Sequence, residues 1–191
     1  MKTIITDCDG VLLDWAFAFK VWMADQGYIR LPDTDQHFQM SKQFGISEKE
    51  ALDKVNEFNQ TGSLGYLPAF RDSIEHVTRL HREGWKFEVI SMIGPDKYAQ
   101  RLRQHNLVHL FGDIFDYIYC AGDFTKPKRD ILEERYKGKN YIWVEDRIDY
   151  AKDGEAVGLN TFMMDHPYNR SYNGQRVNNW KELYDAAQQC K

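Results

Sequence analysis

The stretch Thr3-Ile4-Ile5-Thr6-Asp7-Cys8-Asp9-Gly10 begins as a short apolar run and becomes polar at Asp7. Four further apolar-rich runs follow along the chain, at residues 86–90, 117–120, 141–144 and 160–164. Segments with helical periodicity lie between most of them. Short apolar runs that alternate with helices are typical of a parallel sheet with helices on its faces. We therefore expect an α/β fold, a three-layer Rossmann-like parallel sheet.

Residues 15–65 interrupt this alternation, because helical patterns follow one another there without a strand between them. The patterns cover residues 15–26, 36–44 and 48–59. Ser47 and Glu50 have the spacing of a capping box at the start of the last one. This predicts a small helical insert after the first strand, with residues 1–14 and 66–191 forming the core domain and residues 15–65 the insert.

The composition limits the size, the location and the partners of the protein. A chain of 191 residues, 42% of them hydrophobic, can bury one core with a small appended module. The net charge of −4 argues against a dedicated nucleic-acid binder. The three cysteines lack metal-ligand spacing, and no apolar run approaches the roughly 20 residues that cross a bilayer. These features predict a soluble, cytoplasmic protein without a membrane as partner.

Polar side chains collect where the predicted strands end. They are Asp7 and Asp9 after the first strand, Ser91 after the second, Lys126 before the fourth, and Glu145 and Asp146 after it. Ligands of open parallel sheets bind at the carboxyl ends of the strands. Carboxylates gathered there repel one another unless a cation lies among them, and oxygen ligands suit Mg²⁺. A lysine and a serine hydroxyl would bind the remaining phosphate oxygens, so these residues indicate a divalent-metal phosphoryl site.

The same residues resemble the four motifs of the haloacid dehalogenase (HAD) superfamily of phosphatases, in the family's order. The matching stretches are Ile4-Ile5-Thr6-Asp7-Cys8-Asp9-Gly10-Val11-Leu12, then Val89-Ile90-Ser91, then Lys126-Pro127 with Asp130-Ile131, and finally Val144-Glu145-Asp146 with Ala151 and Gly158. Each motif is weak alone, and Asp7 and Asp9 by themselves could simply form a turn after a strand. Together, the four motifs make a phosphatase the best interpretation.

The resemblance implies a role for each acidic residue. Asp7 would attack phosphorus and form an aspartyl-phosphate. Asp9 would protonate the leaving oxygen and then deprotonate the hydrolytic water. Mg²⁺ would be held by the Asp7 carboxylate, the Asp9 backbone carbonyl and Asp146. Glu145 would support the metal ligands directly or through water.

The resemblance also implies that Ser91 and Lys126 bind the phosphoryl oxygens. Lys128 lies two residues further on and is the alternative lysine. Pro127 favours Lys126 in this comparison. Cys8, between two catalytic aspartates, should point away from them by strand alternation and pack in the core.

A helical cap over the strand ends would restrict the site to small phosphorylated substrates. Phe19 and Phe38 are the first candidates among the insert's aromatic residues to face the substrate. The run Asp9-Gly10-Val11-Leu12-Leu13-Asp14-Trp15 and the segment 165–180 resemble the 5′(3′)-deoxyribonucleotidase branch, which suggests a (deoxy)nucleoside monophosphate.

Three alternatives to a nucleotidase stay open. One is a sugar-phosphate or other small-molecule phosphatase. Another is a polynucleotide-end phosphatase, prompted by the pair Asp146-Arg147 but opposed by the acidic net charge and the predicted cap. The third belongs to a different class, a non-catalytic phosphate- or nucleotide-binding module. Dehalogenation is disfavoured, because the haloacid enzymes of the superfamily lack the second aspartate that Asp9 provides.

Overall fold

The strands of the protein form one parallel sheet with β1 in its interior. The computed structural model describes residues 2–121 and 127–189. Within these residues the sheet has six strands in the order β3-β2-β1-β4-β5-β6. Their bounds are β1 (Thr3–Thr6), β2 (Lys86–Met92), β3 (Phe115–Ala121), β4 (Ile142–Glu145), β5 (Asn160–Met164) and β6 (Gln175–Val177). The predicted Rossmann-like α/β fold is confirmed.

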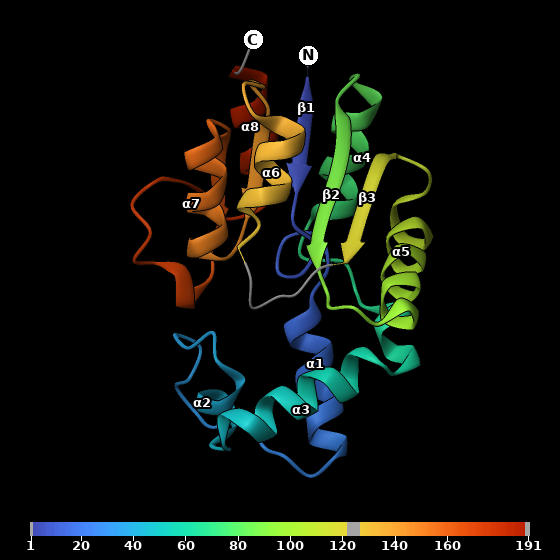
Figure 1. Cartoon of the computed structure of the whole chain (residues 1–191), viewed down its shortest axis with the longest axis vertical. Coiled ribbons are helices and arrows are strands. Elements are labelled where there is room, and N and C mark those ends of the chain that lie inside the picture. The colour runs from blue at the N-terminus through green and yellow to red at the C-terminus, as the bar shows by residue number, and fades with distance from the viewer. Residues whose placement is uncertain (1, 122–126, 190–191) are drawn as a thin grey trace.

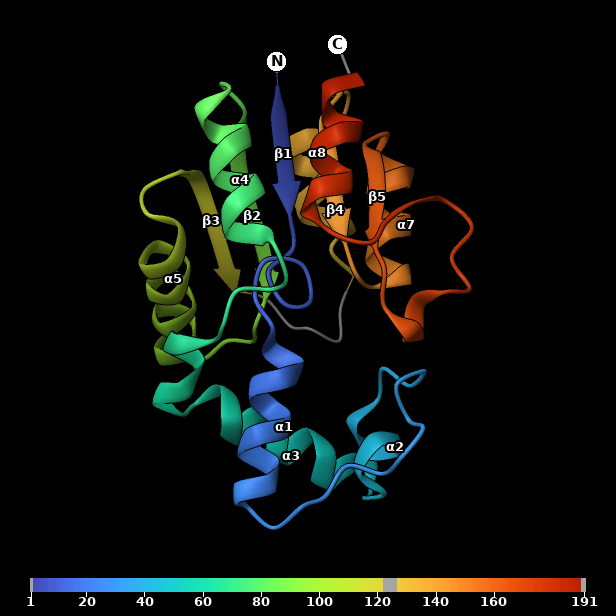
Figure 2. The ribbon, with the colours of Figure 1, turned by 180° about the vertical axis from the view of Figure 1, so that it is seen from behind.

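Helices cover both faces of the sheet, as the burial of β1 requires. Ile4 and Ile5 are both fully buried, although neighbouring side chains of a strand point to opposite faces. Ile4 packs in one apolar cluster and Ile5 in another. Figures 1 and 2 show the covering helices, which are α4 (Ser73–Arg82) and α8 (Trp180–Gln189) on one face and α6 (Arg129–Tyr136) and α7 (Ile148–Val157) on the other. A further helix, α5 (Lys97–Phe111), packs beside β3 at the edge of the sheet.

The helices of residues 15–65 lie beyond the carboxyl ends of β1, β2 and β3 (Figure 1). They are α1 (Trp15–Asp25), α2 (Met40–Phe44), α3 (Glu48–Asn59) and the 3₁₀ helix η1 (Gly62–Tyr66). Asp14 caps α1 by accepting a hydrogen bond from the Phe17 amide, and Ser47 caps α3 by accepting one from the Glu50 amide. We call this segment the helical insert.

Two short elements near the end of the chain were missed by the sequence pattern. They are the edge strand β6 and the 3₁₀ helix η2 (Pro167–Asn169). In β6 only Val177 is buried, so the strand has no alternating pattern to read. Its pairing with β5 is decided by backbone hydrogen bonds, which do not depend on side-chain type.

Two strand ends that carry predicted site residues also differ from the sequence-based expectation. Strand β2 continues to Met92, so Ser91 lies within the strand rather than after it. Strand β4 likewise continues to Glu145, so Glu145 is the last residue of this strand rather than a residue after it. None of the helices in the described residues is both long and apolar enough to cross a membrane.

Candidate active site

The strand register brings Asp7 to the same edge of the sheet as Ser91 and Glu145. Thr6, the last residue of β1, pairs with Val89 on one side and Val144 on the other. The Asp7 amide donates a 2.9 Å hydrogen bond to the Val144 carbonyl, which fixes the chain as it leaves the sheet. Asp7 and Glu145 directly follow two of these paired positions, and Ser91 lies two residues after Val89, so all three lie at the carboxyl ends of the strands.

Three carboxylates form a buried cluster at this edge. Asp7, Glu145 and Asp146 each offer an oxygen atom, and these atoms lie within 4.8 Å of one another. All three residues are buried. Carboxylates held so close in a medium of low polarity repel strongly, so a divalent cation among them would stabilise the arrangement. The donor set is all oxygen, which is the set that Mg²⁺ prefers, and the cluster fits such an ion.

Lys128 supplies a positive charge within the cluster. Its Nζ atom lies 2.6 Å from Oδ1 of Asp7 and 2.8 Å from Oε2 of Glu145. Burial alone would lower the pKa of Lys128, but the charges of Asp7 and Glu145 outweigh it and hold the pKa above its ordinary value. Lys126, the other candidate lysine, lies outside the described residues. Among the described residues, Lys128 is the lysine that contacts Asp7.

Glu145 shapes the loop that carries Asp146. Its Oε1 atom accepts hydrogen bonds from the backbone amides of Asp146 and Arg147, at 2.9 and 3.1 Å. Burial and the charge of Asp7 raise the pKa of Glu145 well above its ordinary value, and the same two causes raise the pKa of Asp146 to about 6. One lysine therefore does not compensate three buried carboxylates, which again favours a bound cation.

Residues from the segment after β5 hold Asp146 from the other side. The Tyr168 hydroxyl donates a hydrogen bond to Oδ2 of Asp146, and the Asn169 side chain donates one to its backbone carbonyl at 2.7 Å. His166 stacks on Tyr168, and its Nε2 atom donates a 2.8 Å hydrogen bond to the Gly10 carbonyl. In the sequence, this segment was noted only because residues 165–180 resemble the 5′(3′)-deoxyribonucleotidase branch. No local signal predicted its contact with Asp146, because the two follow different strands, Asp146 after β4 and this segment after β5.

Gly10 allows the loop after β1 to pass close to Asp146. Its φ of 71° lies in the left-handed region, and a Cβ atom placed there would lie 2.7 Å from Oδ2 of Asp146.

We expect Gly10→Ala to cost about 1–3 kcal/mol of stability through backbone strain. It should also displace Asp146 and so weaken Mg²⁺ binding. Thermal unfolding and a Mg²⁺ titration followed by calorimetry would measure the two effects. Gly138→Ala is the control, since that glycine also has a positive φ but no atom of the described residues lies within 4 Å of its Cβ position. Unchanged Mg²⁺ affinity in Gly10→Ala would contradict this account.

Asp9 is bound from the core side by Arg103 of α5. Nη2 of Arg103 donates to Oδ2 of Asp9 at 2.9 Å, and Nη1 donates to Oδ1. Nη1 also lies 3.0 Å from the sulfur of Cys8, which is buried as expected. Arg103 could not be identified from the sequence, because it lies 94 residues from Asp9 in the chain and belongs to none of the four motifs.

Solved structures with the same architecture come from HAD hydrolases. The HAD-like family hydrolase SP0104 from Streptococcus pneumoniae superposes with a TM-score of 0.68 at 15% identity, covering 97% of this chain and 98% of that one. The D,D-heptose 1,7-bisphosphate phosphatase from B. bronchiseptica, complexed with magnesium and phosphate, gives 0.55 at 14% identity and covers both chains fully. CbbY from Rhodobacter sphaeroides, in complex with phosphate, gives 0.61 at 17% identity over 96% of each chain. This chain has the HAD hydrolase fold.

Sequence comparison adds one relative. An uncharacterized 32.4 kDa protein of Enterobacteria phage T4 is 24% identical over 191 residues, which is 95% of this chain and 68% of the phage protein. No protein-family model matches the chain. The likeness to HAD hydrolases that these comparisons show is therefore one of fold.

Two aromatic side chains of the helical insert lie in different surroundings on this HAD fold. Phe19 is buried inside the insert, where it stacks on Trp15 and meets Phe58 edge-on. The expectation that Phe19 faces a substrate is therefore wrong, because its ring is needed for the insert's own core. Phe38 instead reaches the core domain, where its ring packs edge-on against Tyr168, with centroids 5.3 Å apart. The Arg147 guanidinium lies 5.2 Å from the centre of the Phe38 ring.

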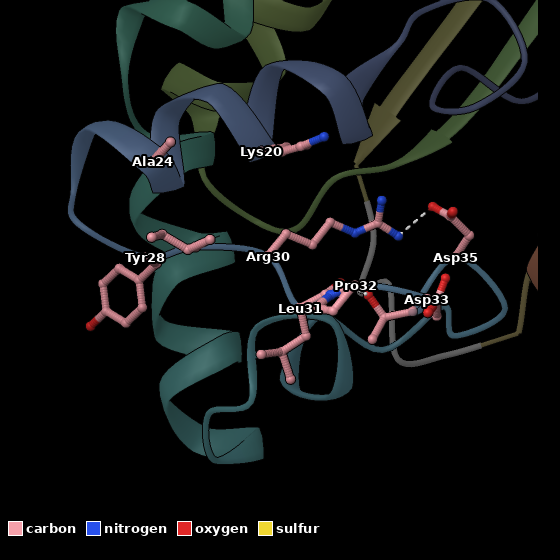
Figure 3. Close-up of a pocket in the computed structure, with 10 residues that line it drawn as sticks. Lys20, Ala24, Tyr28, Arg30, Leu31, Pro32, Asp33 and Asp35 are labelled. Atoms are coloured by element: carbon pink, nitrogen blue, oxygen red, sulfur yellow. Dashed lines mark hydrogen bonds and ion pairs between the residues drawn. The ribbon is translucent and has the colours of Figure 1, made fainter.

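The helical insert also contains a pocket of about 360 Å³ between α1 and the segment that follows it (Figure 3). Lys20 and Arg30 point to the same side of this pocket, and Arg30 pairs with Asp35 at 2.6 Å. Asp33 also lines it, so the two positive and two negative side chains balance. A pocket with balanced charges does not select an anion over a neutral group.

Proposed function

We propose that the protein is a Mg²⁺-dependent phosphomonoesterase that works through an aspartyl-phosphate on Asp7. The observation that supports this most is the buried cluster of Asp7, Glu145 and Asp146, with Lys128 bonded to the first two. A non-catalytic binding module would not need so costly a cluster of buried charges around a nucleophile. The presence of phosphatases among proteins with this fold agrees with the proposal.

In the proposed mechanism the carboxylates have separate roles as nucleophile, as acid and base, and as metal ligands. Asp7 attacks phosphorus, and Asp9 transfers a proton to the leaving oxygen and later takes one from water. The carboxylates of Asp7 and Asp146, with the Asp9 backbone carbonyl, would hold Mg²⁺. When bound, the ion neutralises charge on the phosphoryl group. Glu145 positions Asp146 by accepting hydrogen bonds from the backbone amide of that residue.

The phosphoryl oxygens would be bound by Ser91 and by a lysine. We propose Lys128 for this role, since its contact with Asp7 would reduce the repulsion between Asp7 and an incoming phosphate. Ser91 is buried in β2, the strand next to Asp7. Lys126 is the alternative that the third motif suggested.

The substrate would be a small phosphorylated metabolite, since the helical insert lies beyond the strand ends as a cap would. A (deoxy)nucleoside monophosphate is the first candidate, from the resemblance of the loop after β1 and of the segment 165–180 to deoxyribonucleotidases. A sugar phosphate is the second, favoured by two proteins of the same fold, a heptose bisphosphate phosphatase and CbbY bound to xylulose bisphosphate.

Two assays test this proposal. The first follows hydrolysis of p-nitrophenyl phosphate with Mg²⁺, and after removal of the ion with EDTA. The second compares nucleoside monophosphates, sugar phosphates and phosphorylated oligonucleotides by phosphate release. Activity that depends on Mg²⁺ supports an enzyme, and the order of kcat/KM in the second assay identifies the substrate class. Binding of these compounds without any release of phosphate would favour the non-catalytic module.

The contact of Phe38 with the core leads to a prediction about substrate choice. Phe38→Ala removes the ring that meets Tyr168 and Arg147, so the insert should close less firmly over the leaving group. We expect KM for the preferred metabolite to rise about tenfold, as the loss of about 1.4 kcal/mol of binding implies. Hydrolysis of p-nitrophenyl phosphate, which has a small leaving group, should change less than threefold.

Phe17→Ala is the matched control, because Phe17 lies on α1 and is 57% exposed, close to the 43% of Phe38. Steady-state kinetics of both variants on both substrates make the comparison. Equal losses on the large and the small substrate in Phe38→Ala would indicate a misfolded insert and contradict a role in substrate choice.

A further inference from the structure

Arg103 has an unusual environment for a guanidinium group. The residue is fully buried on α5, and both of its terminal nitrogens bond to the two carboxylate oxygens of Asp9. Its remaining nitrogen, Nε, has no hydrogen-bond partner in the part of the chain that the structure describes. Nη1 of Arg103 also donates a hydrogen bond to the sulfur of Cys8. This thiol stays neutral, because burial raises the pKa of Cys8. Asp9 is thus the one anionic partner of Arg103 among the described residues.

A structural role alone does not account for this pair. Burial of a guanidinium costs several kcal/mol, and well-packed apolar side chains are often as stabilising as a buried ion pair. Here the guanidinium also leaves one polar atom unsatisfied. The arrangement does provide a two-point contact, which fixes the plane as well as the position of a carboxylate. A single lysine or an apolar residue could not do this.

The two members of the pair differ in exposure. The Arg103 side chain is completely enclosed, whereas that of Asp9 is 36% exposed. Arg103 therefore holds Asp9 from the core side. A carboxylate has about four lone-pair sites, and the guanidinium occupies two of them. The remaining sites stay available on the exposed side of Asp9.

We propose that Arg103 is a positioning residue, which holds the Asp9 carboxylate so that its free lone pairs exchange protons with the leaving group and with water. This inference rests on the proposed phosphatase function. In the first step an oxygen of Asp7 forms a bond to phosphorus, the bond from phosphorus to the leaving oxygen breaks, and that oxygen takes its proton from Asp9. In the second step water attacks phosphorus and gives a proton to Asp9, while the electron pair of the breaking bond returns to Asp7.

The test uses Arg103→Met, which keeps an unbranched side chain in the same space, and two kinds of substrate. An alkyl phosphate needs a proton on its leaving oxygen, so we expect kcat to fall about 100-fold, the scale of a misplaced acid. With p-nitrophenyl phosphate the leaving group needs no proton, but the second step still needs Asp9. Rapid mixing should therefore show a burst of about one equivalent of nitrophenol per enzyme, followed by slow turnover.

A double mutant separates positioning from structural support. If Arg103 acts through Asp9, Arg103→Met should change kcat less than threefold in an Asp9→Asn background, because residues that act as a unit are not additive. Arg103→Lys keeps the charge but loses the two-point contact, and we expect it to recover part of the activity lost in Arg103→Met. If Arg103→Met fails to fold, Arg103→Lys takes its place in the comparison with Asp9→Asn.

The possible failures can be told apart. A wild-type protein without Mg²⁺-dependent activity on any substrate overturns the proposed function and this inference together. An active wild type overturns the inference alone in either of two cases. One is that Arg103→Met retains kcat within threefold on the alkyl phosphate. The other is that it causes the same 100-fold loss with and without Asp9.

Discussion

Asp7→Asn should lower Mg²⁺-dependent phosphate release by about 10⁴-fold or more, the scale seen when a nucleophile is removed. The amide is nearly the same size as the carboxylate but is a far weaker nucleophile and a poorer ligand for a cation. Asp7 also bonds to Lys128, so the change removes one of the two carboxylate charges that face this lysine. Phosphate release with an alkyl phosphate, at saturating Mg²⁺, is the measurement.

Asp149→Asn is the matched control for this loss. Asp149 lies on α7 close to the site in sequence, but its side chain is exposed and pairs with Arg147. We expect the phosphate-release activity of Asp149→Asn to stay within threefold of wild type. The thermal midpoint of Asp7→Asn should remain close to that of wild type, because the variant also relieves repulsion among the three carboxylates. Undiminished turnover in Asp7→Asn would refute the aspartyl-phosphate mechanism.

Lys128→Ala should have the second largest effect, on stability as well as on activity. The change leaves Asp7 and Glu145 buried without their shared cation, and breaking a buried pair in this way costs about 3–5 kcal/mol. Phosphoryl transfer should fall by about 10²–10³-fold, the loss typical of removing one group that stabilises the transition state. Chemical denaturation and steady-state kinetics measure the two effects.

Added Mg²⁺ should restore more of the stability lost in Lys128→Ala than it adds to wild type, because a divalent ion can replace the missing positive charge. Lys126→Ala and Lys137→Ala complete the series. Lys137 is exposed and pairs with Glu133 one helical turn away, so its loss should change little. We expect Lys126→Ala to cost less activity than Lys128→Ala. The opposite order would assign the phosphate-binding role to Lys126.

The sequence predicted the parts of the fold in which burial forces a local pattern. The strands at Thr3–Thr6 and Asn160–Met164 and the helix at Glu48–Asn59 lie at the predicted residues. The apolar runs and the cap at Ser47 are local signals, and each persists in the folded chain. The strand β6 lacks such a signal, because three residues at a sheet edge bury only Val177.

The local sequence could not decide which of two nearby lysines contacts Asp7. Lys126 and Lys128 differ little in sequence context, and the proline between them favoured the first. The contact of Lys128 with Asp7 depends on how α6 docks against the sheet, a property of the whole fold. The same holds for Phe19 and Phe38, which are equally aromatic but lie in the insert's core and at the domain contact respectively.

By itself, the sequence determined the order of the strands and helices and the acidic and polar residues at the strand ends. It did so because strand periodicity and the residues that follow each strand are encoded within a few neighbouring positions. The tertiary structure alone decided that Lys128 lies between Asp7 and Glu145, that Tyr168 reaches Asp146, and that Arg103 holds Asp9. These pairs lie 17 to 121 residues apart, and chain packing rather than local preference brings them together.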